Sequence, residues 1–120
     1  MPELIEIKTF KDERGSLGAI GEELPFSVKR VFYIYDVKAK RGGHRHVKSI
    51  QALICLNGSC KVYVQNNEED FTFSLEDNKT CLILDHRDWH TMDDFSPGSV
   101  LLVLASEPYT AADYIYEPYK

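Results

Sequence analysis

Short stretches in which hydrophobic and polar residues alternate recur along the whole chain, and they predict β-strands. In residues 61–65 two valines alternate with a lysine, a tyrosine and a glutamine, the two-residue period of a strand with one buried face. Residues 30–37 are rich in aromatic and β-branched side chains, which favour strands. Residues 100–105 are continuously apolar, which predicts a strand buried on both faces. Further strands are expected at residues 4–7, 50–56, 71–75 and 81–84.

Turn signals separate these stretches. Asn57-Gly58 lies between two apolar runs and predicts a hairpin that joins residues 50–56 to residues 59–65. A short helix is expected near the C-terminus, where Thr110 is placed to cap it and Asp113 follows three residues later, in a variant of the capping box. Seven or more short strands separated by turns are typical of a β-sandwich or barrel.

The length and charge of the chain narrow the function classes. The 120 residues suit one domain, residues 1–120, with one core. There are 14 Lys and Arg residues against 19 Asp and Glu, a net charge of -5, which argues against a general nucleic-acid binder because such proteins need a basic stripe. A local basic pocket for one phosphorylated ligand remains compatible with this balance.

The distribution of apolar residues and cysteines points to a cytoplasmic protein. No segment approaches the roughly 20 apolar residues that span a bilayer, and the N-terminal residues lack the apolar run of a signal peptide. Cys55, Cys60 and Cys81 are odd in number and form no CxxC motif, so they are expected to be reduced and buried.

A paired-histidine motif carries the candidate chemistry. The stretch RGGHRH places His44 and His46 two residues apart, so that in a strand both side chains point to one side and can line one cavity. The motif resembles the first motif of the cupins, but Gln51 stands where metal-dependent cupins carry a glutamate. His90 is placed to supply a third ligand, so a three-histidine metal site stays open as an alternative. The plainest alternative is a pair of packed or surface histidines at a strand end.

Without a metal, two histidines suit acid–base chemistry. An unperturbed imidazole titrates near pH 6.5 and can therefore both accept and donate a proton near neutrality. Moving a proton between adjacent carbons through an enediol needs one base and one acid, and it needs neither a covalent nucleophile nor a redox cofactor.

Four blocks make the resemblance more specific. RVFYIYDV, RGGHRH, QALICLNGS and FSPGSVLLVLAS occur in this order from residue 30 to residue 106, and together they resemble the nucleotide-sugar 3,4-ketoisomerases, cupins that act on dTDP-4-keto-6-deoxyglucose. The tail residues Tyr109, Asp113, Tyr114 and Ile115 also fit this family. The resemblance implies an all-β cupin fold, which is a double-stranded β-helix or jelly-roll barrel.

The same resemblance implies a reaction and its residues. In this family the ketone moves from C4 to C3 of the sugar through an enediol, with no metal or other cofactor, and the product feeds the synthesis of 3-amino-3,6-dideoxyhexoses for surface glycans. His44 matches the family's base at C3, and His46 matches the partner histidine in the same pocket.

Two further positions concern stereochemistry at C4. In the family, the residue before an N-terminal glycine and the residue after a tryptophan vary together. Tyrosine and arginine accompany the gluco product, and arginine and histidine accompany the galacto product. Here Arg14 precedes Gly15 and His90 follows Trp89, so the galacto product is expected, with His90 as proton donor at C4. The alternative for Arg14 is a solvated turn residue.

Four more side chains are candidates for substrate binding. Arg30 and Arg41 are expected to contact the diphosphate, because a guanidinium matches phosphate geometry, and Arg41 lies only three residues before His44. Tyr33 is a candidate for a hydrogen bond to the sugar or diphosphate, and Trp89 for the border of the site. The alternative for both aromatic residues is simple packing, which is the commoner role of a strand tyrosine, and the alternative for both arginines is a surface position.

The resemblance also implies a homodimer in which N-terminal strands are exchanged between subunits. Three other functions stay open: a metal-dependent cupin enzyme, a nucleotide-sugar 3,5-epimerase, and a non-catalytic sugar-binding cupin. The RGGHRH and FSPGSVLLVLAS blocks favour the ketoisomerases over the epimerases.

Overall fold

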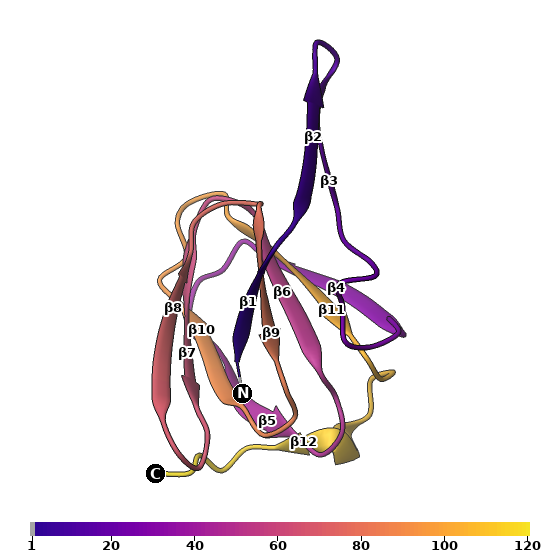
Figure 1. Ribbon diagram of the computed structural model, residues 1–120. Coiled ribbons are helices and arrows are strands. Elements are labelled where there is room, and N and C mark those ends of the chain that lie inside the picture. The colour runs from indigo at the N-terminus through magenta and orange to yellow at the C-terminus, as the bar shows by residue number, and fades with distance from the viewer. Residues whose placement is uncertain (1) are drawn as a thin grey trace.

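Two five-stranded antiparallel sheets face each other in the computed structural model, which describes residues 2–120 (Figure 1). The first sheet has the order β1-β9-β6-β11-β4 and the second β12-β5-β10-β7-β8. A separate hairpin of β2 and β3 projects from this body (Figure 1). The elements are β1 (Glu3–Glu6), β2 (Lys8–Asp12), β3 (Gly15–Ala19), β4 (Arg30–Tyr35), β5 (Arg41–His46), β6 (Gln51–Asn57), β7 (Cys60–Gln65), β8 (Asp70–Leu75), β9 (Thr80–Leu84), β10 (Trp89–Asp93), β11 (Val100–Ala105), the 3-10 turn η1 (Ala111–Asp113) and β12 (Tyr114–Ile115).

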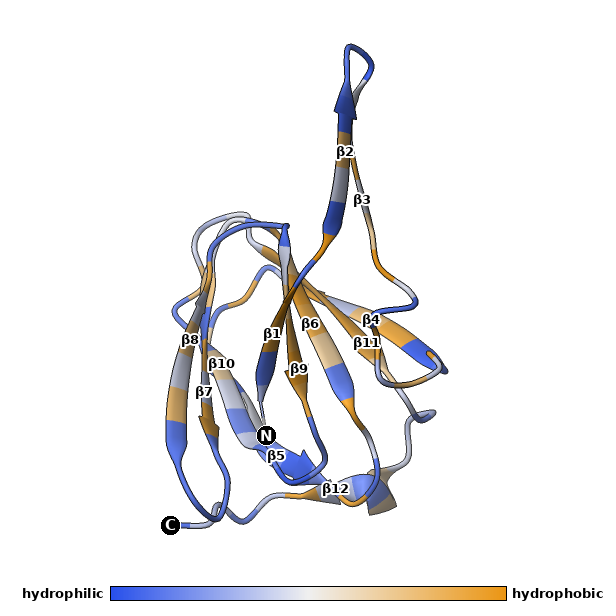
Figure 2. Cartoon of the chain, viewed as in Figure 1, coloured by the Kyte–Doolittle hydropathy of each residue, from blue (hydrophilic) through white to orange (hydrophobic). Residues whose placement is uncertain are grey.

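The main core lies between the two sheets. Successive residues of a strand point to opposite faces, and the inward ones are the buried ones: Val62 and Val64 of β7 and Leu101 and Val103 of β11 are 0–1% exposed. The alternation predicted for residues 61–65 is therefore confirmed. Figure 2 shows the hydrophobic residues concentrated on β6, β9 and β11, with polar residues at the tip of the β2–β3 hairpin.

A second apolar cluster covers the outer face of the first sheet. Ile54 and Ile83 are buried there beneath Ile20, Leu24 and Phe26, which belong to the segment that follows β3. The outward residues of β11 pack into the same cluster. This strand is thus covered on both sides, as its continuous apolar run predicts.

The predicted hairpin at Asn57-Gly58 is wrong. β6 pairs with β9 and β11, whereas β7 pairs with β8 and β10, so the turn carries the chain from one sheet to the other. The turn is fastened instead to a distant loop, where Ser59 N donates to Ser96 Oγ at 2.9 Å and Ser96 N donates to Ser59 O at 2.9 Å. Turn residues reverse the chain locally, but long-range strand pairing decides which edges meet.

The predicted C-terminal helix is only one 3-10 turn. Thr110 occupies its N-cap position but makes no side-chain capping hydrogen bond. The Asp113 carboxylate, expected to take part in the cap, instead accepts hydrogen bonds from Lys48 N and Ser49 Oγ. Burial of the Ser49 hydroxyl, which would otherwise lack a partner, favours the distant contact over the local one. In the described part of the chain, no helix is long and apolar enough to cross a membrane.

The three cysteines are free and buried, as predicted. Burial raises the pKa of the Cys60 and Cys81 thiols to about 12, because the apolar interior disfavours the thiolate. Burial also raises the pKa of the Cys55 thiol.

Candidate active site

Three histidines meet on the inner face of the second sheet. β5 carries His44 and His46, and the neighbouring strand β10 places His90 directly opposite His44. Ring centroids are 5.0 Å apart for His44 and His46, 5.1 Å for His44 and His90, and 6.2 Å for His46 and His90. The structure thus brings together the three histidines that the sequence analysis assigns to one site.

A glycine makes this strand pairing possible. A Cβ atom at Gly42 would lie 2.9 Å from the His90 carbonyl oxygen, and Gly42 has a φ of +85°. Both the close approach and the left-handed backbone conformation favour glycine. The glycine-rich approach to the histidines therefore has a local structural reason.

The C-terminal tail, residues 107–120, adds a tyrosine to the cluster. β12 pairs with β5, with Tyr114 opposite His46. The Tyr114 ring centroid lies 4.6 Å from that of His44 and 4.8 Å from that of His46. Arg30 reaches the same place: its Nη1 donates to Tyr114 Oη at 3.3 Å, and its guanidinium lies over the Phe32 ring at 4.4 Å.

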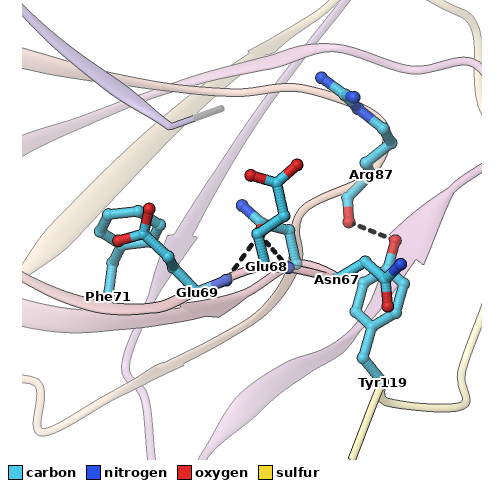
Figure 3. A pocket seen from close by; sticks show the side chains of 7 residues that line it. Asn67, Glu68, Glu69, Phe71, Arg87 and Tyr119 are labelled. Atoms are coloured by element: carbon cyan, nitrogen blue, oxygen red, sulfur yellow. Dashed lines mark hydrogen bonds between the residues drawn. The ribbon is translucent and has the colours of Figure 1, made fainter.

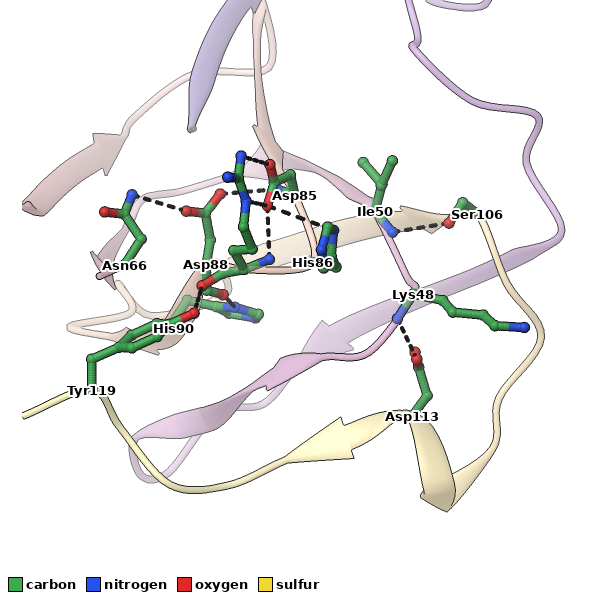
Figure 4. Close-up of polar contacts among 11 residues, drawn as sticks. Lys48, Ile50, Asn66, Asp85, His86, Asp88, His90, Ser106, Asp113 and Tyr119 are labelled. Atoms are coloured by element: carbon green, nitrogen blue, oxygen red, sulfur yellow. Dashed lines mark hydrogen bonds and ion pairs between the residues drawn. The ribbon is translucent and has the colours of Figure 1, made fainter. Parts of the chain in front are cut away.

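Hydrogen bonds hold the tail, and Figure 4 shows the one between Lys48 and Asp113. Lys48 N donates to Asp113 Oδ1 at 2.7 Å, and Ser49 Oγ donates to Asp113 Oδ2 at 2.6 Å. Val47 N donates to Asp113 O at 2.9 Å, and Trp89 Nε1 donates to the Tyr116 carbonyl at 3.0 Å. These contacts fix the backbone on both sides of Tyr114.

Burial keeps the histidines neutral. Desolvation, followed by the effect of nearby His90, lowers the pKa of His44 to about 3 and that of His46 to about 4. The Asp113 carboxylate opposes this effect at His46. Burial also lowers the pKa of His90. All three rings are therefore neutral imidazoles near pH 7, the form that accepts a proton.

Hydrogen bonding fixes the tautomer of His90. Its Nδ1 lies 3.0 Å from the Asp88 carbonyl oxygen, as Figure 4 shows. A carbonyl only accepts hydrogen bonds, so Nδ1 carries the proton and Nε2 has a lone pair. His46 Nε2 is buried and has no hydrogen-bond partner within residues 2–120. Such an atom is costly unless a ligand pairs with it.

Of the five residues predicted to bind substrate, the structure brings only Arg30 to the histidines. Trp89 precedes His90 and so lies on the opposite face of β10, where it holds the tail. Tyr33 is on the outer face of β4, is 62% exposed, and stacks on Tyr35. Arg41 is exposed at the start of β5.

Arg14 lies in the turn of the projecting hairpin. Its Nη2 contacts Asp12 Oδ2 at 2.6 Å, and its side chain is 86% exposed. Within one chain it is therefore a solvated turn residue, the alternative that the sequence left open.

Tyr114 and Asp113 were missed as site residues, although both belong to the tail that fits the family. One signal was available: Tyr114 and Tyr116 alternate, as residues on one face of a strand do. What the sequence did not reveal is that this strand pairs with β5.

No metal-binding group is formed in the part of the chain that the structure describes: no three His, Cys, Asp or Glu side chains there are arranged to hold a metal ion. Gln51, predicted to replace a carboxylate ligand, is buried at the start of β6.

A separate hollow of about 130 Å³ lies beside the turn after β7 (Figure 3). Asn66 Oδ1 accepts hydrogen bonds from the N–H groups of Glu68 and Glu69, and Tyr119 Oη donates to the Arg87 carbonyl. None of the three histidines lines this hollow, so it is distinct from the histidine cluster. Its lining residues are Asn66, Asn67, Glu68, Glu69, Phe71, Arg87 and Tyr119.

Comparison with known proteins shows the family to which the chain belongs. The family model FdtA, described as "WxcM-like, C-terminal", matches residues 1–120. A TDP-4-oxo-6-deoxy-alpha-D-glucose-3,4-oxoisomerase of Aneurinibacillus thermoaerophilus is 43% identical over 123 residues, covering 98% of this chain and 88% of the relative.

Solved structures agree as well. The 3,4-ketoisomerase QdtA of Thermoanaerobacterium thermosaccharolyticum, in complex with TDP, is 42% identical with a TM-score of 0.92, over 97% of this chain and 88% of that chain. A 3,4-ketoisomerase of Helicobacter canadensis is 36% identical with a TM-score of 0.92, over 97% and 90% of the two chains. The predicted all-β cupin-type fold is thereby confirmed. The chain belongs to the FdtA family and, like these relatives, is an isomerase.

Proposed function

We propose that the protein is a 3,4-ketoisomerase that moves the ketone of dTDP-4-keto-6-deoxyglucose from C4 to C3 by metal-free proton transfer through an enediol. The observation that carries this proposal is the cluster of three neutral imidazoles on one face of the second sheet. The names of the relatives support the choice of substrate, since they are TDP-sugar oxoisomerases and ketoisomerases.

His44 is the base at C3. It is only half-buried, unlike His46 and His90, so it is the ring of the three that a substrate reaches first. The C3 proton is acidic because the C4 carbonyl accepts the electron pair left behind. A neutral imidazole near pH 7 is able to take this proton. His46 lies beside it, and its unpaired Nε2 is available to hydrogen-bond the sugar.

His90 delivers the proton to C4. At rest its Nε2 carries no proton, so it must first be loaded. The His44 ring, 5.1 Å away by centroid, becomes an imidazolium when it takes the C3 proton and is the nearest source. His90 together with Arg14 supports the galacto configuration of the product, as the pairing of these residue types in the family implies.

The protein works as a homodimer with exchanged N-terminal strands. Phe10 and Leu17 are opposite each other in the β2–β3 hairpin and are 59% and 58% exposed. A two-stranded hairpin is marginally stable alone, so it needs a surface to lie on. The outer face of β4 exposes Val31, Tyr33 and Tyr35 and offers that surface on a second copy.

In such a dimer, Arg14 enters the partner's site. Within one chain it sits in the turn of a hairpin that projects from the body (Figure 1), so its predicted role needs a second subunit. Arg30, which already lies at the histidines, is the arginine placed to contact the sugar diphosphate.

The test is to incubate the protein with dTDP-4-keto-6-deoxyglucose in deuterated water and to follow the sugar by NMR. We expect the ketone to move to C3 and deuterium to appear at C4, because the imidazole protons exchange with the solvent before one is delivered to C4. His44→Asn should lose most turnover and still bind TDP, whereas His86→Asn, at an exposed histidine, should keep both. Binding without turnover by the unaltered protein would indicate a sugar-binding cupin. Inversion at C3 and C5 would indicate an epimerase. Stoichiometric bound metal needed for turnover would refute the metal-free mechanism.

A further inference from the structure

Migration of the ketone also moves a proton from O3 to O4 of the sugar. The roles proposed for the three histidines do not account for this transfer. In the substrate C3 carries a hydroxyl and C4 a carbonyl, and in the product these are reversed. One proton leaves C3 and one arrives at C4, while one proton leaves O3 and one arrives at O4. This inference rests on the proposed function and asks which group of the site serves the two oxygens.

Tyr114 lies where such a group is needed. Its ring centroid is 4.6 Å from that of His44 and 4.8 Å from that of His46, closer than the 5.0 Å that separates the two imidazoles. A sugar held against His44 therefore lies beside the Tyr114 side chain as well. The ring is partly exposed, and its hydroxyl lies within hydrogen-bond distance of Arg30 Nη1.

The hydrogen-bonding capacity of the phenol matches the task. A tyrosine hydroxyl has one donor and two acceptor positions. Arg30 Nη1 occupies one acceptor position at 3.3 Å, and it is the one hydrogen-bond partner of this hydroxyl among residues 2–120. One donor and one acceptor position remain, which is what a relay between two sugar oxygens requires.

The backbone holds the phenol in place. Tyr114 pairs with His46 across β12 and β5, and the preceding residue, Asp113, is fixed by Lys48 N and Ser49 Oγ. Tyr109 packs against the same ring at a centroid distance of 5.6 Å. The position of Tyr114 is thus fixed by its backbone pairing, by packing of its ring and by the hydrogen bond to its hydroxyl. A side chain held in this way is suited to a proton transfer that requires precise geometry.

We propose that Tyr114 is a catalytic residue that relays the proton between the two sugar oxygens. As His44 removes the C3 proton, the C3–H electron pair forms the C3=C4 bond and the carbonyl pair moves onto O4. Tyr114 gives its hydroxyl proton to O4 and takes the O3 proton. When C4 is protonated, the O3 electron pair forms the new carbonyl. The tyrosine is neutral before and after, and the step needs neither oxidant nor metal.

The experiment compares Tyr114→Phe with Tyr63→Phe. Tyr114→Phe keeps the ring that packs on both imidazoles and removes only the hydroxyl. Tyr63 lies on β7 with its hydroxyl on exposed Asp70, so it is a matched control outside the site. We expect kcat to fall about 100-fold in Tyr114→Phe, in the range of a lost acid–base group, with KM and the Kd for TDP within threefold of the unaltered protein. Tyr63→Phe should retain full activity.

The outcomes separate the relay from a packing role. A fall in kcat of less than tenfold, or a fall matched by an equal loss of TDP affinity, would overturn the proposal. A fluorinated tyrosine at position 114 provides a second variant if Tyr114→Phe does not fold: it keeps the ring and the hydroxyl but makes the phenol more acidic, so it should change kcat at least about threefold while leaving the Kd for TDP unchanged. An unchanged kcat would overturn the proposal. Failure of the unaltered protein to convert the sugar would refute the proposed function itself, a result distinct from an active protein that tolerates Tyr114→Phe.

Discussion

The Asp113 carboxylate accepts a 2.6 Å hydrogen bond from the Ser49 hydroxyl, and both side chains are buried. This contact joins the C-terminal tail to the connection between β5 and β6. Tyr114, the next residue, is thereby set against His44 and His46. A polar contact at the edge of the site thus positions an aromatic side chain within it.

Loss of the Asp113 charge should destabilise the fold. Asp113→Asn places an amide against two donors, Lys48 N and Ser49 Oγ, and weakens both contacts. We expect a loss of about 1–3 kcal/mol in the free energy of unfolding, measured by urea denaturation. Asp94→Asn is the control, since Asp94 makes an exposed 3.6 Å ion pair with Lys61 and should change stability by less than about 0.5 kcal/mol. Equal effects of the two changes would contradict the assigned role.

Gly58 should tolerate alanine far less well than Gly98. Both glycines have a φ of +74°, but a Cβ at Gly58 would lie 2.5 Å from Ser96 Oγ and 2.9 Å from Ser99 Cβ, whereas at Gly98 the nearest atom is 4.0 Å away. We expect Gly98→Ala to cost about 1 kcal/mol for the backbone alone and Gly58→Ala at least about 2 kcal/mol. Thermal or urea unfolding of the two variants provides the comparison. Similar losses in the free energy of unfolding for the two variants would show that Ser96 and Ser99 shift to accommodate a Cβ at position 58.

Stability should decrease as the pH falls below about 6.5. The pKa values of folded His44 and His46 are lowered to about 3 and about 4, whereas in the unfolded chain they are near 6.5. The unfolded state therefore binds more protons between these values, and stability rises with pH across that window. For buried His46 alone we expect a loss of about 1–2 kcal/mol between pH 6.5 and 4.5.

A variant without the His44 and His46 rings tests whether these two residues cause the pH dependence. The double variant His44→Asn/His46→Asn should lose much of the pH dependence, measured as melting temperature against pH. His86→Asn, whose side chain is 45% exposed, should retain it. An unchanged pH profile in the double variant would show that other groups cause the acid sensitivity.

Polar residues on the hairpin should break the dimer. Phe10→Ser/Leu17→Ser removes two exposed apolar side chains that face no core of their own chain. We expect sedimentation to show a dimer for the unaltered protein and a monomer for the double variant, with the fold of the body kept. A monomeric unaltered protein would refute the exchanged-strand arrangement.

Mixed dimers would test whether Arg14 acts across subunits. Arg14→Ala and His44→Asn should each be inactive alone. In a hybrid dimer, one site combines His44 of one subunit with Arg14 of the other, so activity should return on mixing and refolding. No recovery would place Arg14 in the site of its own chain or outside both sites.

The histidine site shows which parts of a structure follow from local sequence. His44 and His46 point the same way because a strand repeats every two residues, and that is visible in the sequence alone. His90 is predicted to join them because it is placed to supply a third ligand and follows Trp89, as the family resemblance implies. Tyr114 joins them only because β12 pairs with β5, a contact between residues far apart in the chain that no local pattern encodes.

The turn at Asn57-Gly58 shows the same limit for the fold. Its residues correctly mark a chain reversal with positive φ at Gly58. Whether two flanking strands then pair depends on competition among all strand edges, and here β11 and β10 occupy the edges beside β6 and β7. The predicted strands were therefore largely correct while one predicted pairing was wrong.

The buried cysteines give the protein an internal reporter of unfolding. Cys60 and Cys81 have pKa values near 12, and all three thiols are shielded by the folded chain. Alkylating reagents attack thiolates, so the native protein should resist them at neutral pH. Labelling would then occur only on chains that have opened. The rate of labelling, followed by mass spectrometry, would measure how often the intact domain opens without any added fluorophore or engineered residue.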